Sequence, residues 1–124
     1  MRYCLHTGIE TVLGAERIKY CAAIDASGGA QSWTLVPELQ SRMIRAVRNS
    51  QAAIFFFQVE NDYNLAPSRV LSSAMKNAGK PAEMKIYPAY GESAAEGHAF
   101  ARSGASVWSE DVFGFLGRYC KARQ

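Results

Sequence analysis

The sequence predicts an α/β fold built on a parallel sheet, and three observations lead to this prediction. Segments typical of strands alternate with segments typical of helices along the 124 residues. The strongest strand segment, residues 53–59, is almost entirely apolar, which is typical of a strand covered on both faces. Glycines and prolines separate the segments. Strands that alternate with helices are joined by right-handed crossovers, so we expect a parallel sheet with helices on its faces.

The first half of the chain contains two predicted helices around one strand. Residues 8–17 form a short helix, because their apolar side chains fall on one side. Residues 20–24 form a short apolar strand that ends before the turn at residues 28–29. Residues 37–49 form the second helix, in which Pro37 suits the first turn.

The second half repeats the alternation twice. After the strand at 53–59, apolar residues at helical spacing predict a helix over 67–78, which stops at Gly79. Residues 83–87 alternate moderately well and form the next strand, and residues 106–121 form a last helix. The sequence therefore predicts about three parallel strands with flanking helices.

Size and composition favour a single globular domain covering residues 1–124. Hydrophobic residues make up 48% of the chain and charged residues 20%, which argues against disorder. The net charge of +3 is spread along the chain, so nucleic acid is not an expected partner. Arg42, Arg45 and Arg48 recur every three residues, and we expect them to form a solvated stripe on a helix.

The cysteines and histidines exclude several classes of site. Cys4, Cys21 and Cys120 lie far apart without a CxxC pair, so the sequence favours reduced thiols over a disulfide framework or a zinc site. With His6 and His98 as its two histidines, the chain offers no multi-histidine metal centre. We expect no metal and no cofactor. Because it has neither an apolar run of membrane-spanning length nor a signal peptide, we expect a soluble cytoplasmic protein without a membrane partner.

An aspartate and a histidine follow successive predicted strands. Asp62 comes after the strand at 53–59, and His98 comes after the strand at 83–87. Catalytic groups of parallel sheets collect at the carboxyl ends of the strands, so both side chains are expected at one edge. A histidine that acts as a general base needs a carboxylate on its other ring nitrogen. The alternatives are a turn or helix cap for Asp62 and an ordinary loop position for His98.

The segment FFFQVENDYNLAPSRVLSSAMKNAGKPAEMKIYPAYGESAAEGHAF resembles the C-terminal part of dienelactone hydrolase-like α/β-hydrolases. The similarity extends to AAIDASGGAQSW before it and to VWSEDVFGFLGRY after it, and so covers nearly the whole chain after about residue 8. The resemblance implies a partial α/β-hydrolase fold that contains the C-terminal half of the sheet. It also implies that Asp62 is the acid and His98 the base of a catalytic triad, with Glu60 and Asn61 as supporting loop residues.

The nucleophile elbow of that family, G-x-S-x-G, does not occur in the sequence. By the resemblance the elbow falls at residues 3–7, where Leu5 stands in place of the serine. A shift of one residue makes Cys4 the nucleophile, as in cysteine-using members of the family. Ser27 lies near glycines, but on a loop where the family has a structural turn. We therefore expect a truncated domain whose residues 1–7 are disordered or a remnant of the elbow.

Two functions remain open from the sequence. The first is a hydrolase that acts on a small-molecule ester, a lactone or a related acyl bond, or a peptidase-like serine or cysteine hydrolase, through an acyl-enzyme. We expect weak or no activity from the chain alone, because the elbow is lost. The second is a non-catalytic fragment or subunit that self-associates through an exposed sheet edge. Alternatively, the same edge pairs with a separate chain that bears the nucleophile.

Overall fold

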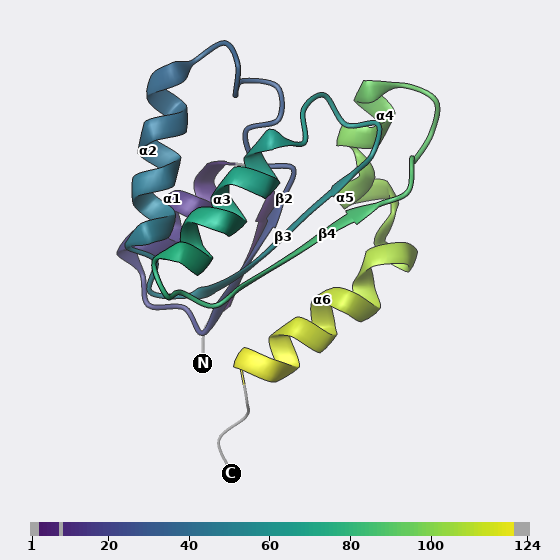
Figure 1. Cartoon of the computed structure of the whole chain (residues 1–124). Coiled ribbons are helices and arrows are strands. Elements are labelled where there is room, and N and C mark those ends of the chain that lie inside the picture. The colour runs from purple at the N-terminus through teal and green to yellow at the C-terminus, as the bar shows by residue number, and fades with distance from the viewer. Residues whose placement is uncertain (1–2, 8, 121–124) are drawn as a thin grey trace.

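A parallel sheet of four strands forms the centre of the molecule (Figure 1). The computed structural model describes residues 3–7, for which only the backbone is considered, and residues 9–120. The strand order follows the chain, β1-β2-β3-β4, and all three pairings are parallel. The strands are β1 (Tyr3–Thr7), β2 (Ala22–Ala26), β3 (Ala53–Val59) and β4 (Ala82–Tyr87). The α/β prediction is confirmed, and its three expected strands correspond to β2, β3 and β4.

Helices cover both faces of the sheet, as Figure 1 shows. One face carries α1 (Ile9–Arg17), α2 (Pro37–Arg48) and α3 (Ala66–Asn77). The other face carries α5 (Phe100–Ser103) and α6 (Ala105–Tyr119). The short helix α4 (Ala94–His98) comes after β4, in a segment for which the sequence predicts a loop.

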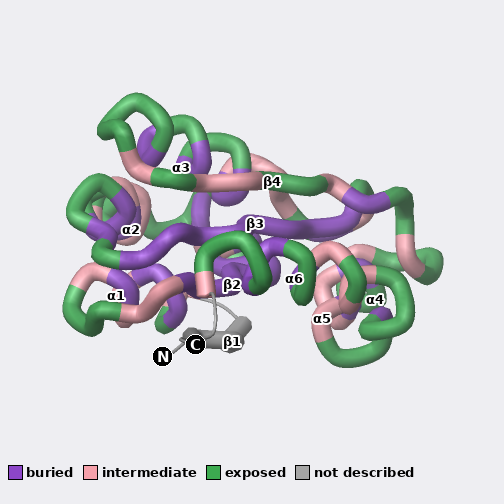
Figure 2. Tube along the Cα trace, turned by 90° about the horizontal axis from the view of Figure 1, so that it is seen from below, coloured by how far each residue is buried: buried purple, intermediate pink, exposed green. Residues whose placement is uncertain are grey.

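Strand β3 supplies core residues to both faces, because successive side chains of a strand point to opposite sides. Ile54 and Phe56 pack with α1, α2 and α3, whereas Phe55 and Phe57 pack against α5 and α6. Every residue of β3 is buried, and Figure 2 shows the strand as a continuous buried segment through the centre of the molecule. Burying one such phenylalanine contributes roughly 2–3 kcal/mol.

Strand β1 corrects the expectation for the start of the chain. Residues 3–7 pair in register with residues 22–26, so they form a strand instead of a disordered segment or a sharp turn. The register sets Cys4 opposite Ala23 and Leu5 opposite Ile24, and the backbone stays extended through both candidate elbow positions. Pairing with β2 satisfies backbone groups that an isolated segment would leave to water.

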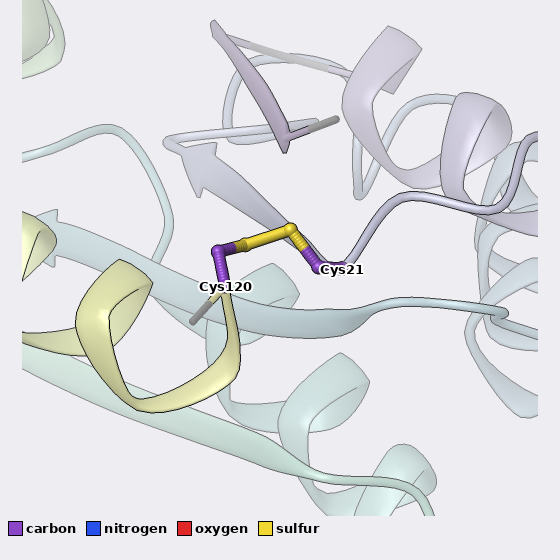
Figure 3. The surroundings of a disulfide bond; sticks show 2 residues. All are labelled: Cys21 and Cys120. Carbon is purple, nitrogen blue, oxygen red and sulfur yellow. A yellow bond between two sulfur atoms is a disulfide. The ribbon is translucent and has the colours of Figure 1, made fainter. Parts of the chain in front are cut away.

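A disulfide joins Cys21, just before β2, to Cys120 at the end of α6 (Figure 3). The two Cα atoms lie 5.3 Å apart, although 99 residues separate them in the sequence. The expectation of three separate reduced thiols was therefore wrong for this pair. Spacing along the chain gave no sign of it, because the fold brings the two residues together.

Candidate active site

Asp62 and His98 meet at the carboxyl end of the sheet. Asp62 lies in the loop between β3 and α3, and His98 is the last residue of α4, which follows β4. The His98 Nδ1 atom lies 3.0 Å from Asp62 Oδ1. The Asp62 side chain is 0% exposed and that of His98 is 33% exposed. The structure therefore brings together the two residues that the sequence selected, with the carboxylate inside and the imidazole at the surface.

Three donors surround the Asp62 carboxylate. Oδ1 accepts a hydrogen bond from the Tyr63 backbone N–H at 2.7 Å in addition to its contact with His98. Oδ2 accepts one from Gln58 Nε2 at 3.0 Å. Hydrogen bonds of this kind compensate for taking a carboxylate out of water, and they also fix its orientation.

The His98 ring has one hydrogen-bonded nitrogen and one left over. If Asp62 is ionised, it can only accept, so the proton of a neutral imidazole belongs on Nδ1. Nε2 makes no hydrogen bond within residues 9–120 and remains for a ligand. Tyr63, a residue that is 45% exposed, packs its ring edge-on against His98 with centroids 5.5 Å apart.

Asn61 joins the Asp62 loop to the segment that leads into α4. Its Nδ2 donates to the backbone oxygens of Tyr90 and Ser93, at 2.8 and 2.9 Å, and its Oδ1 accepts from the Tyr90 N–H at 2.8 Å. Gly97 packs closely on this side chain, because an added Cβ would lie 2.9 Å from the Asn61 amide atoms. These contacts tie the loop that carries Asp62 to the segment that leads into α4, and the supporting role expected for Asn61 stays a prediction.

The other candidate residues are Cys4, Leu5, Glu60 and Ser27. Cys4 and Leu5 belong to β1, and their side chains fall outside the described part of the structure. Glu60 is exposed and joins the β4 end through its backbone N–H, which donates to the Tyr87 oxygen at 2.9 Å. Ser27 is buried and has φ of 61°, an unusual backbone angle for a residue other than glycine.

Two buried polar residues, Gln58 and Asp25, were not selected from the sequence. Gln58 contacts Asp62 directly and is fully buried in β3. The sequence offered one sign of this contact: Gln58 is the single polar residue in an apolar strand and lies four positions before Asp62. Asp25 is the second: it is buried at the end of β2, and one of its oxygens accepts a hydrogen bond from the Gly28 N–H at 3.0 Å. Burial raises the pKa of Asp25 to about 7, an effect that the Gly28 hydrogen bond partly offsets.

The described residues offer neither a metal site nor a membrane-spanning helix. Among them, no group of three or more histidine, cysteine, aspartate or glutamate side chains could hold a metal ion. In the same part of the chain, no helix is both long and apolar enough to cross a membrane.

The comparison with solved structures identifies the fold. The chain superimposes on acylaminoacyl peptidase in complex with Z-Gly-Gly-Phe-chloromethyl ketone with a TM-score of 0.67 and 16% identity. Uncomplexed Pyrococcus horikoshii acylaminoacyl peptidase gives a TM-score of 0.66 and 17% identity. Each match covers 97% of this chain and 24% of the peptidase, so the chain spans about a quarter of those proteins. No protein-family model matches the chain, and no curated protein matches it either.

These matches establish the fold class. Acylaminoacyl peptidase is an α/β-hydrolase, and the chain has a partial α/β-hydrolase-like fold. At this level of identity the likeness concerns the fold, and function has to come from the site itself.

Proposed function

We propose that the chain carries the acid–base half of a hydrolase that acts on ester, lactone or related acyl bonds, as its resemblance to dienelactone hydrolase-like proteins implies. The observation that supports this most directly is the 3.0 Å contact between His98 Nδ1 and the buried Asp62. A small-molecule ester or lactone is the proposed substrate class. The amide bond of a peptide comes second, because the similar solved structures are peptidases.

In this proposal Asp62 holds the His98 ring so that Nε2 faces the reacting groups. A nucleophile attacks the acyl carbon, and its proton passes to Nε2. The tetrahedral intermediate then expels the alcohol, which takes that proton, and an acyl-enzyme remains. Water repeats the sequence: Nε2 removes its proton, the acid leaves, and the nucleophile recovers the proton from Nε2.

Two sources of the nucleophile belong to this proposal. One is Cys4, by resemblance to the cysteine-using members of the family, and the other is a serine supplied from outside this chain. The extended backbone at Cys4 differs from the sharp turn that an elbow provides. We therefore propose weak or no turnover by the chain alone, since the loss of one oxyanion donor already costs about 3 kcal/mol in the transition state.

Hydrolysis of p-nitrophenyl acetate by the purified chain tests these statements. Any turnover above the blank should disappear in His98→Ala, which removes the proposed base. Turnover that survives this substitution would contradict the assignment of His98. Loss of turnover in Cys4→Ser would select the cysteine over an external serine. Efficient turnover by the unmodified chain would contradict the proposed inactivity.

A non-catalytic subunit is the second candidate, and the open edge at β1 favours it. Strand β1 pairs with β2 on one side, and within the described residues no strand pairs with its other side. Its sequence, YCLHT, has no aspartate, glutamate, lysine or arginine, whereas the opposite edge strand β4 carries Glu83 and Lys85. Charged residues protect edge strands from pairing, so β1 is the edge we propose for self-association or for a complementary chain. Sedimentation equilibrium tests this candidate, and a clean monomer at micromolar concentration would contradict self-association.

The cytoplasmic location expected from the sequence also remains a proposal. Disulfides persist mainly in oxidising compartments, so the Cys21–Cys120 pair makes the redox state a direct test. Of the three cysteines, two are paired in this structure. Alkylation of the thiols at lysis under denaturing conditions without reductant, counted by mass spectrometry, should find one free thiol per chain. Three free thiols would show that the pair is reduced in the producing cell and would favour the cytoplasm.

A further inference from the structure

Gln58 is the one polar residue of β3, and its amide is fully engaged. Its Nε2 donates to Asp62 Oδ2 at 3.0 Å and to the Asn64 backbone oxygen at 2.8 Å. Its Oε1 faces the Ser68 N–H in the first turn of α3, at 3.4 Å. The residue is 0% exposed. A buried amide without partners is costly, so these contacts explain how the chain tolerates a glutamine here.

The partners allow only one orientation of the Gln58 amide. Rotating it by 180° would turn Oε1 toward the oxygens of Asp62 and Asn64 and would turn the NH₂ group toward the Ser68 N–H. Gln58 therefore presents a fixed donor to Oδ2 of Asp62. The strand position holds that donor, because β3 pairs with a neighbour on each side.

We propose that Gln58 is a positioning residue for the Asp62–His98 pair. The Asp62 carboxylate can turn about its Cβ–Cγ bond, and the Gln58 hydrogen bond to Oδ2 opposes that rotation. Oδ1 then stays directed at His98 Nδ1, which fixes the ring orientation and the tautomer with the proton on Nδ1. The catalytic consequence rests on the proposed hydrolase function, whereas the effect on the His98 ring does not require turnover.

Nitrogen-15 NMR of the imidazole rings tests the proposal on the whole chain. The chain has two histidines, so a His6→Gln variant assigns the signals. We expect a hydrogen-bonded Nδ1–H of His98 in the unmodified protein. In Gln58→Met, which keeps the length but removes the donor, its exchange with water should become about tenfold faster, as expected for the loss of one hydrogen bond to a charged group. Ile54→Val, in the same strand, is the control for general loosening and should leave the signal unchanged. An unaltered His98 signal in folded Gln58→Met would overturn the proposal.

A reciprocal measurement covers the case in which Gln58 variants fail to fold. His98→Gln changes a partly exposed residue, and it should shift the side-chain amide signals of Gln58 through the shared carboxylate. Unchanged Gln58 amide signals would overturn the proposal. If the esterase assay finds turnover, Gln58→Met should lower kcat about tenfold with little change in KM. If the NMR effects occur and any esterase turnover survives in His98→Ala, the positioning role stands and the proposed hydrolase function fails.

Discussion

Two neighbouring strands of the sheet each have a buried aspartate at or just after their carboxyl end, and the two carboxyl groups differ in their hydrogen-bond partners. Asp62, after β3, accepts hydrogen bonds from Gln58, Tyr63 and His98. Asp25, at the end of β2, accepts one from Gly28, and burial raises its pKa to about 7. The comparison shows that two buried carboxyl groups can receive very different numbers of hydrogen bonds. Asp62 has donors aimed at both of its oxygens, whereas Asp25 has one backbone donor and a pKa that burial raises.

Replacing Asp25 by asparagine should give the largest effect, and it should be favourable. The folded-state pKa of about 7 lies above the unfolded value of 3.8, so the folded protein binds the proton more tightly. The resulting stability is fully present at low pH and is lost as the pH rises through about 7. Between about pH 5 and about pH 9 the unmodified protein should lose about 3 kcal/mol of unfolding free energy that Asp25→Asn retains. Urea unfolding at both pH values measures this, and parallel pH profiles would contradict it.

The same substitution at Asp62 should have the opposite sign. Asparagine places an NH₂ group where the carboxylate oxygens now accept from Gln58, Tyr63 and His98. A donor that faces a buried donor leaves both unsatisfied, so Asp62→Asn should lower the unfolding free energy by about 2 kcal/mol. Urea unfolding near neutral pH measures it. Stabilisation by this variant would remove the distinction between the two carboxyl groups.

Gly97→Ala tests the spacing between the two loops of the site. The new Cβ would lie 2.9 Å from the Asn61 amide atoms, so the loop must move, at a cost of about 1 kcal/mol. Gly117→Ala in α6 is the matched control, since its Cβ would meet nothing within 4 Å and alanine favours a helix. Thermal unfolding of both variants should therefore shift in opposite directions, and an equal shift would show that the contact between Gly97 and Asn61 is not tight.

Glu60→Ala should give the smallest effect, within about 0.5 kcal/mol, as is usual for exposed positions. The Glu60 side chain is exposed, and its backbone N–H, which the substitution keeps, makes the contact to Tyr87. Urea unfolding that shows a loss above about 1 kcal/mol would mean that the supporting role of this loop involves the Glu60 carboxylate as well as its backbone.

Much of the fold and the central pair of the site could be predicted from the sequence. Asp62 and His98 follow successive strands of a parallel sheet, and that placement alone puts them at one edge. The contact between Gln58 and Asp62 was not predicted. Within an apolar run the sequence identifies Gln58 only as a strand residue, and the contact depends on the direction of its side chain. Strand β1 was not predicted, because its five residues have no strong pattern and pair only once β2 is in place. The Cys21–Cys120 pair depends on how α6 returns to the start of β2.

The Cys21–Cys120 bond turns most of the polypeptide into a covalent ring. Strands β2, β3 and β4, and with them Asp62 and His98, lie within that ring, whereas β1 and α1 lie on the tail outside it. A single proteolytic cut in an exposed loop inside the ring would therefore leave one covalent molecule. A cut between α1 and Cys21 would instead detach β1. The part of the sheet that bears Asp62 and His98 is thus held together independently of the strand in which Cys4 lies.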